Sequence, residues 1–192
     1  LKEKRSLQAA ILVLVLSVAT LGAWYVITHR VEIPTIGGEY VEALIGQPQQ
    51  INPLYASSND ADADIASLVY SGMLKWHPED GFVNDLAESV EINEDGTIYT
   101  IHLREDAKFH NGDQVRSRDV LFTINAIQNN AYRSPLEISF RGVTVEQVDD
   151  KTIAFLLQEP FAPFLSTLTV GILPAGAWAS ITPKNALLAS LN

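Results

Sequence analysis

Residues 86–124 read LAESVEINEDGTIYTIHLREDAKFHNGDQVRSRDVLFTI, and this stretch contains clear signals for a β-hairpin and a helix. Two runs of strand-forming residues, 89–92 and 98–103, flank the sequence Asn93-Glu94-Asp95-Gly96. Such a polar, glycine-containing stretch between two strands is typical of a β-hairpin turn. The sequence therefore predicts a hairpin here, followed by a further turn at 111–113.

The end of the same stretch enters a segment with helical periodicity, from Ser117 to Gln128. Ser117 is a residue type that often caps a helix N-terminus, and we expect it to do so here. Apolar residues recur three or four positions apart, which predicts one buried face. The residues of this face are Val120, Leu121, Ile124 and Ile127.

Outside this stretch, helices and strands are also mixed. A second hairpin is predicted from strands at 143–148 and 152–157, around Asp149-Asp150-Lys151. A strand is expected at 39–45, and a short buried strand at 170–173 before a helical start. Because strands and helices do not alternate strictly, the pattern favours an α/β or α+β fold over a barrel or bundle.

A helix is predicted over residues 60–73. Asp60 and Asp62 suit its positively polarised start. We expect its apolar face to consist of Ile65, Leu68, Val69 and Met73. Gly72 weakens the end of this helix.

Residues 9–28 form a run of 20 residues without a charge, AAILVLVLSVATLGAWYVIT. As a helix this run is ~30 Å long, the thickness of a bilayer core. The basic segment 1–8 before it favours a cytoplasmic N-terminus. We expect an uncleaved transmembrane anchor, with a cleavable signal peptide as the alternative, and a linker at 29–38. Either reading exports the rest of the chain.

The charge distribution excludes some partners. The chain carries −10 overall, but the first thirty residues hold four basic and one acidic residue, so the remainder is net −13. An acidic exterior repels phosphates, and nucleic acid is not an expected partner. The absence of cysteine excludes disulfides, thiolate metal sites and a lipid-modified cysteine.

Four segments in series resemble the peptide/nickel class of ABC-transporter solute-binding proteins, extracellular solute-binding family 5. They are GGEYVEALIGQPQQINPL, LVYSGMLKWHPEDG, the stretch 86–124 and VEQVDDKTIAFLLQEPFAPFL. The resemblance covers about residues 37–174. The most specific part is 86–120, which holds "LAES", "DGTIYTIHLR", "AKFHNGD" and "DVLFT" in order.

The resemblance implies an α/β, two-lobed fold of the periplasmic-binding-protein type II kind, of which this chain is expected to be the N-terminal part. Residues 39–192 form the solute-binding part. Within it, 39–52 would be the first strand of the larger lobe, 53–164 a small subdomain, and 165–192 the return to the larger lobe. Many relatives use a lipidated cysteine or a cleaved signal, whereas this chain is expected to use its N-terminal helix as an anchor.

The loop 47–53, QPQQINP, is the strongest candidate for ligand contact, because in the resembled family it borders the binding cleft. Amide side chains both donate and accept hydrogen bonds, as a peptide backbone requires. The alternative is an ordinary connecting loop. The candidate ligand-binding residues are Gln47, Gln50, Asn52, Tyr55 and Tyr132.

No catalytic motif, phosphate-binding loop or cofactor motif is present in the sequence. His102, Asp106 and His110 do not follow a metal-ligand spacing, so neither a metal nor a cofactor is expected. The leading interpretation is a non-enzymatic, extracytoplasmic binding component of an ABC importer, held at the membrane by its helix. It would capture oligopeptides or similar solutes for permease subunits. Alternatives are a membrane-anchored sensor with the same binding fold and an anchored hydrolase.

Overall fold

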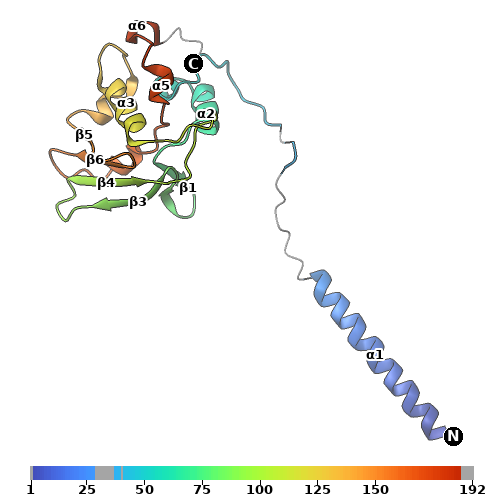
Figure 1. Cartoon of the computed structure of the whole chain (residues 1–192). Helices are drawn as coiled ribbons and strands as arrows, with labels where there is room; N and C mark the ends of the chain where they lie inside the picture. The colour runs from blue at the N-terminus through green and yellow to red at the C-terminus, as the bar shows by residue number, and fades with distance from the viewer. Residues whose placement is uncertain (1, 29–36, 40, 187–192) are drawn as a thin grey trace. The chain divides into compact units, whose positions relative to one another are not determined.

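The computed structural model describes residues 2–28, 37–39 and 41–186, in two units that span 1–43 and 44–192. The N-terminal unit contains α1 (Lys2–Thr28), a continuous helix that takes in the whole uncharged run 9–28 (Figure 1). Within the described residues, 11–28 is the one helical stretch long and apolar enough to cross a membrane. A signal sequence has the same properties, so the helix agrees with both readings of this segment.

The strand predicted at 39–45 is not observed. Its described residues, 39 and 41–45, belong to no strand, and Tyr40 lies outside the described residues, as does 29–36 of the predicted linker. A strand is defined by hydrogen bonds to a neighbour. Neither sheet in the described part of the chain includes this segment, so its strand-forming side chains have no ladder to join.

The second unit begins with two helices, η1 (Ala56–Ser58) and α2 (Asp60–Val69). Two hairpins follow, β1 (Leu74–His77) with β2 (Gly81–Asn84), and β3 (Ala87–Ile92) with β4 (Ile98–Leu103). The remaining elements are α3 (Ser117–Gln128), η2 (Pro135–Phe140), β5 (Thr144–Gln147), β6 (Thr152–Leu156), α4 (Phe164–Thr167), α5 (Ala175–Trp178) and α6 (Pro183–Ala186).

A four-stranded antiparallel sheet in the order β3-β4-β6-β5 forms the centre of this unit. Both predicted hairpins are confirmed. The turn at 93–96 closes because Asn93 Oδ1 accepts hydrogen bonds from the backbone N–H groups of Thr97 and Ile98, both at 2.8 Å. Gly96 has φ +67°, a conformation that glycine adopts without a Cβ penalty.

Helix α3 lies over one face of this sheet, with α5 beside it (Figure 1). Its bounds agree with the prediction, and Val120, Ile124 and Ile127 are fully buried. The predicted cap is wrong. Arg116 occupies the cap position, where its N–H donates to the Asp119 carboxylate at 2.9 Å. Ser117 is the first helical residue and its hydroxyl donates to the Asp149 carbonyl instead.

Helix α2 ends at Val69, four residues earlier than predicted. The predicted apolar face is wrong at Leu68 and Val69, which are 84% and 42% exposed, whereas Ile65 is half-buried and Met73 is buried beyond the helix end. The buried residues of the helix itself are Ala61, Asp62 and Ala66. The helix stops because the chain must then cross the segment 168–172 at close range. A Cβ on Gly72 would lie 2.6 Å from the Thr169 carbonyl, too close for any side chain.

The crossing is held by backbone hydrogen bonds. The N–H of Leu74 donates to the Leu168 carbonyl at 3.1 Å, and the N–H of Ile172 donates to the Ser71 carbonyl at 3.0 Å. The strand predicted at 170–173 is therefore not a strand, although Ile172 and Leu173 are buried as expected. The small hairpin β1–β2 was missed, because its four-residue strands are too short for a clear period-two pattern.

Candidate functional site

The loop 47–53 is fixed by a buried carboxylate. Asp62, in the first turn of α2, is 3% exposed. Its two oxygens accept the backbone N–H groups of Gln49 at 2.7 Å and Gln50 at 3.0 Å. Both donors are therefore satisfied inside the fold, and the amide side chains of the two glutamines carry no part of this anchoring.

Asn52, a residue of the loop itself, makes further hydrogen bonds that hold the loop in place. It is fully buried, and its Oδ1 accepts the N–H of Leu54 at 2.9 Å. Its backbone carbonyl accepts the N–H groups of Tyr55 at 2.9 Å and Ala56 at 2.8 Å, which starts η1. In this position Asn52 shapes the loop and presents no surface to a ligand.

A cavity of about 660 Å³ opens on the outer side of this loop, and we call it the loop cavity. Three segments meet there: the loop itself, the η1–α2 junction, and the turn before η2. The hydroxyl of Ser134, in that turn, donates to the Leu54 carbonyl at 2.6 Å and ties segments 80 residues apart. The lining residues are Gln49, Gln50, Tyr55, Ser57, Ser58, Asn59, Asp60, Asp62, Arg133 and Pro135.

Tyr55 forms the floor of the loop cavity. It is 6% exposed, and its hydroxyl has no hydrogen-bond partner among the described residues. Burial raises the pKa of the Tyr55 phenol, and the neighbouring Tyr132 raises it further. Burial likewise raises the pKa of Tyr132, which is 8% exposed and lies behind Tyr55 rather than in the cavity lining.

Two of the five predicted ligand residues, Gln50 and Tyr55, thus line one cavity. Gln47 is exposed outside it, and its carbonyl accepts the Asn59 side-chain amide at 3.2 Å. Asn52 and Tyr132 support the site from the interior. The cavity therefore lies at the second half of the loop, towards α2.

Sequence reasoning missed Arg133. This residue has φ +55°, and no other non-glycine residue in the described part of the chain has a positive φ. A left-handed backbone at an arginine leaves no mark in composition or periodicity. The available signal was local: Asn129 and Asn130 begin a tight turn, and their carbonyls accept the N–H groups of Tyr132 and Arg133.

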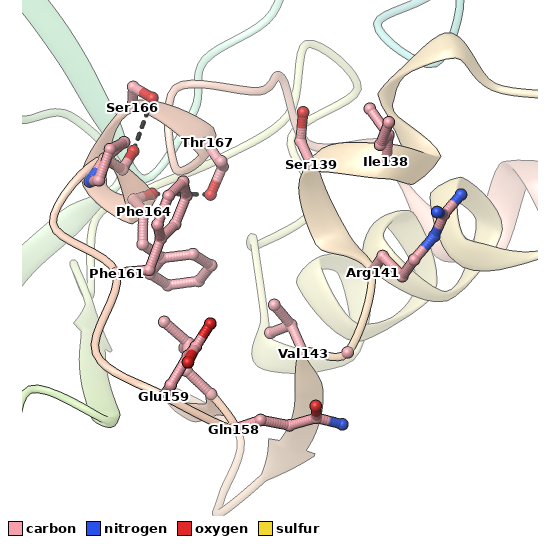
Figure 2. Close-up of a pocket in the computed structure, with 13 residues that line it drawn as sticks. Ile138, Ser139, Arg141, Val143, Gln158, Glu159, Phe161, Phe164, Ser166 and Thr167 are labelled. Carbon is pink, nitrogen blue, oxygen red and sulfur yellow. Dashed lines mark hydrogen bonds between the residues drawn. The ribbon is translucent and has the colours of Figure 1, made fainter.

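A second pocket, of about 440 Å³, lies between η2 and the segment that follows β6 (Figure 2). Three of its polar side chains, those of Arg141, Ser166 and Thr167, are engaged within the fold. Arg141 binds Glu137 through two hydrogen bonds of 3.2 and 3.0 Å, and the hydroxyls of Ser166 and Thr167 donate to carbonyls of their own turn. The pocket therefore offers mainly apolar contact, from side chains such as Phe161, and fewer free polar groups than the loop cavity.

The His102, Asp106 and His110 set does not come together as a metal site. Among the described residues no three potential metal ligands are grouped. Asp106 binds Arg104, with N–O distances of 2.9 Å, and His102 lies 3.8 Å from Glu91 and 3.2 Å from the Thr152 hydroxyl.

Residues 81–185 match the family of bacterial extracellular solute-binding proteins, family 5 (middle region). Among curated proteins, the chain is similar to the oligopeptide-binding protein AppA of Bacillus subtilis. The two are 30% identical over 126 residues, which is 65% of this chain and 23% of AppA. It is also similar to the dipeptide-binding protein of Escherichia coli, with 32% identity over 146 residues, 65% of this chain and 27% of that protein.

The chain is also similar to solved structures of binding proteins. AppA of B. subtilis in complex with a nonapeptide superposes with a TM-score of 0.72 at 26% identity, over 78% of this chain and 30% of AppA. NikZ of Campylobacter jejuni in complex with Ni(L-His) superposes with a TM-score of 0.66 at 32% identity, over 72% and 28%. The chain spans less than a third of the length of each of these relatives.

Proposed function

Because the chain belongs to family 5 of the bacterial extracellular solute-binding proteins, we propose that it serves as the binding component of an ABC importer. In this role it captures oligopeptides outside the cytoplasm and delivers them to permease subunits in the membrane. It binds the solute without making or breaking a bond. The names of its relatives, among them oligopeptide- and dipeptide-binding proteins, support a peptide as the solute.

The observation that carries this proposal is the way Asp62 holds the loop 47–53. With the backbone N–H groups of Gln49 and Gln50 bound to Asp62, the amide side chains of both residues are left for the cavity. An amide that both donates and accepts matches the alternating N–H and C=O groups of an extended peptide. A loop fixed before binding also loses less conformational entropy when the ligand arrives.

We further propose that α1 anchors the protein by a single pass, with the binding unit on the extracytoplasmic side. Lys2 and Lys4 precede the uncharged run, and cytoplasmic flanks of membrane helices are enriched in basic residues. Trp24 and Tyr25 lie near its other end, where aromatic side chains suit the membrane interface.

The test of peptide binding is a thermal-shift screen on the full-length gene product in detergent, against di- to hexapeptides, sugars, haem and nickel. A peptide present at about 100 times its dissociation constant stabilises the protein by about 2.7 kcal/mol. We expect peptides, and not the other classes, to shift the transition. No shift with any peptide would overturn the proposal.

The contribution of the loop cavity is tested with the double variant Gln49→Ala/Gln50→Ala. Both backbone bonds to Asp62 survive this change, so the fold is expected to persist while peptide binding weakens. The matched control is Glu94→Ala/Asp95→Ala in the exposed β3–β4 turn, which changes two polar side chains far along the chain. Equal peptide affinity in all three proteins would remove the loop cavity from the binding site.

A further inference from the structure

Arg133 is a cation without a partner in a strongly acidic protein. Its guanidinium makes no ion pair or hydrogen bond within the described residues, whereas Arg104, Arg116 and Arg141 each bind a carboxylate. The chain after residue 30 carries −13, so acidic partners are plentiful. An arginine left unpaired in such surroundings remains available to a group from outside the chain.

Arg133 also has a strained backbone conformation. A left-handed φ of +55° brings the Cβ of an L-residue close to its own backbone, which costs free energy that glycine avoids. Strained non-glycine positions of this kind cluster at binding sites, where the side chain is needed despite the strain. The strained backbone therefore favours a binding role for the Arg133 side chain.

Hydrogen-bond donors surround the same cavity. The hydroxyls of Ser57 and Ser58 make no hydrogen bond within the described part of the chain, and both residues line the loop cavity with Arg133. The buried hydroxyl of Tyr55, in the floor, also has no partner among the described residues. Arg133 and these hydroxyls together favour a ligand group rich in acceptors.

Two carboxylates, those of Asp60 and Asp62, also line the loop cavity. Asp60 is the first residue of α2, where the positive end of the helix dipole stabilises its charge. It does not form an ion pair with Arg133, so it does not neutralise the guanidinium directly. The other carboxylate of the lining, Asp62, is already occupied by two backbone N–H groups.

We propose that Arg133 binds a carboxylate of the peptide ligand in the loop cavity and thereby selects peptides that carry one at the matching position. A guanidinium presents two parallel N–H groups that match the two oxygens of a carboxylate. The inference rests on the proposed peptide-binding function and adds to it a charge preference. The carboxylate comes either from an acidic side chain or from the peptide C-terminus.

The test is isothermal titration calorimetry with the full-length gene product and four tripeptides. They carry a central glutamate or a central glutamine, each with a free or an amidated C-terminus. We expect Arg133→Ala to weaken binding roughly ten- to hundredfold for peptides with the recognised carboxylate. Loss that follows the glutamate identifies the side chain, and loss that follows the free C-terminus identifies the terminal group.

Two further variants separate binding from folding. Arg118→Ala removes another exposed, unpaired arginine outside the cavity, and it should leave all four affinities unchanged. Arg133→Gly removes the side chain while relieving the left-handed strain, so it should keep or raise the melting temperature and still weaken binding.

The outcomes are distinct. If the wild-type protein binds none of the four tripeptides and none of the screened peptides, the proposed function fails and this inference fails with it. If it binds the doubly neutral glutamine amide as tightly as the others, and Arg133→Ala changes every affinity equally or none, the charge preference is overturned. Peptide binding itself would stand in that second case.

Discussion

Asp62 shows how one buried charge organises the candidate site. A carboxylate at 3% exposure needs hydrogen-bond donors, and here two consecutive backbone N–H groups of the loop supply them. Replacing it leaves both donors without their acceptor and lets the loop move. We expect Asp62→Ala to lower the free energy of unfolding by about 2 kcal/mol, because hydrogen bonds to charged groups contribute about 1.5–3 kcal/mol.

The measurement is urea denaturation, and the same helix provides its control. Asp64 is exposed and its carboxylate binds no described residue, so Asp64→Ala should change stability by less than about 0.5 kcal/mol. Peptide affinity should fall in Asp62→Ala and stay constant in Asp64→Ala. Equal midpoints for the two variants would show that Asp62 does not hold the loop.

Asp149 provides a pH-dependent prediction. Its Oδ1 accepts the N–H of Lys151 at 2.7 Å, and this bond, with a further one from Thr152, lowers the pKa of the Asp149 carboxyl from 3.8. A lowered folded pKa means that ionised Asp149 adds stability above pH 3.8, which is lost as the pH falls through the folded value. Asp149→Asn should therefore be less stable than wild type at pH 7.

The difference should shrink as the pH falls from 3.8 through the lowered pKa of folded Asp149, below which both proteins carry a neutral side chain at this position. Denaturation midpoints recorded from pH 7 downwards test this sign. A gap between the proteins that stayed constant with pH would mean that the Asp149→Asn variant differs from wild type for reasons other than charge.

For individual residues, the sequence indicates which segments supply side chains to the site, but it does not show what each side chain does there. The polar character of the loop 47–53 identified Gln50, and Tyr55 was a separate aromatic candidate; both line the cavity. The same polarity also suggested Asn52, which is a buried residue of the loop, since polarity alone does not distinguish an amide that binds ligand from one that caps a turn. Arg133 was missed because its importance lies in a backbone angle and in the distant segments that line the cavity with it.

Among the elements, the crossing of 70–74 with 168–172 determines where α2 ends. Gly72 contacts the Thr169 backbone so closely that any Cβ would force the two segments apart. Overpacking of this kind typically costs about 1–3 kcal/mol. We expect Gly72→Ala to lower the free energy of unfolding by at least about 1 kcal/mol, as measured by thermal and urea denaturation.

A glycine in a short helix provides the comparison. Gly176, in α5, has nothing within 4 Å of its would-be Cβ. Gly176→Ala should be neutral or stabilising by up to about 1 kcal/mol, from helix propensity alone. If Gly72→Ala were as harmless as Gly176→Ala, close approach at the crossing would not explain the early end of α2.

Elements with a clear local pattern were predictable, and those that depend on a distant neighbour were not. The hairpins at 89–103 and 143–157 and the helix at 117–128 have turn residues or a regular apolar stripe. The apolar residues near the end of α2 also have helical spacing, yet Leu68 is exposed because the chain turns away to make the crossing. The segment 39–45 has strand-forming residues but no partner strand within the described residues.

For the molecule as a whole, the series of matches between 37 and 174 predicted the family, and the comparisons confirm it. The α/β fold of the type II periplasmic binding proteins, present here in part, is confirmed with it. Several short segments in a fixed order identify a fold because each one specifies a different local structure. Examples are the turn at 93–96 and the helix start at 117.

The attachment of the chain to the membrane is the last prediction, and it concerns α1. If the helix is an uncleaved anchor, the protein expressed in a bacterial host should remain in membranes after washing with alkaline carbonate. Intact mass should include residues 1–28, and protease added outside the inner membrane should digest the binding unit.

Replacing Leu14 and Leu16 by lysine places two charges inside the apolar run, which costs several kcal/mol at the centre of a bilayer helix. This variant should lose membrane attachment. The control is the double change Lys2→Arg/Lys4→Arg, which keeps the basic flank and should leave attachment intact. A mature protein that starts within or just after the apolar run and is released by carbonate would identify α1 as a signal peptide. The binding unit would then act free of this tether, with the loop cavity unchanged.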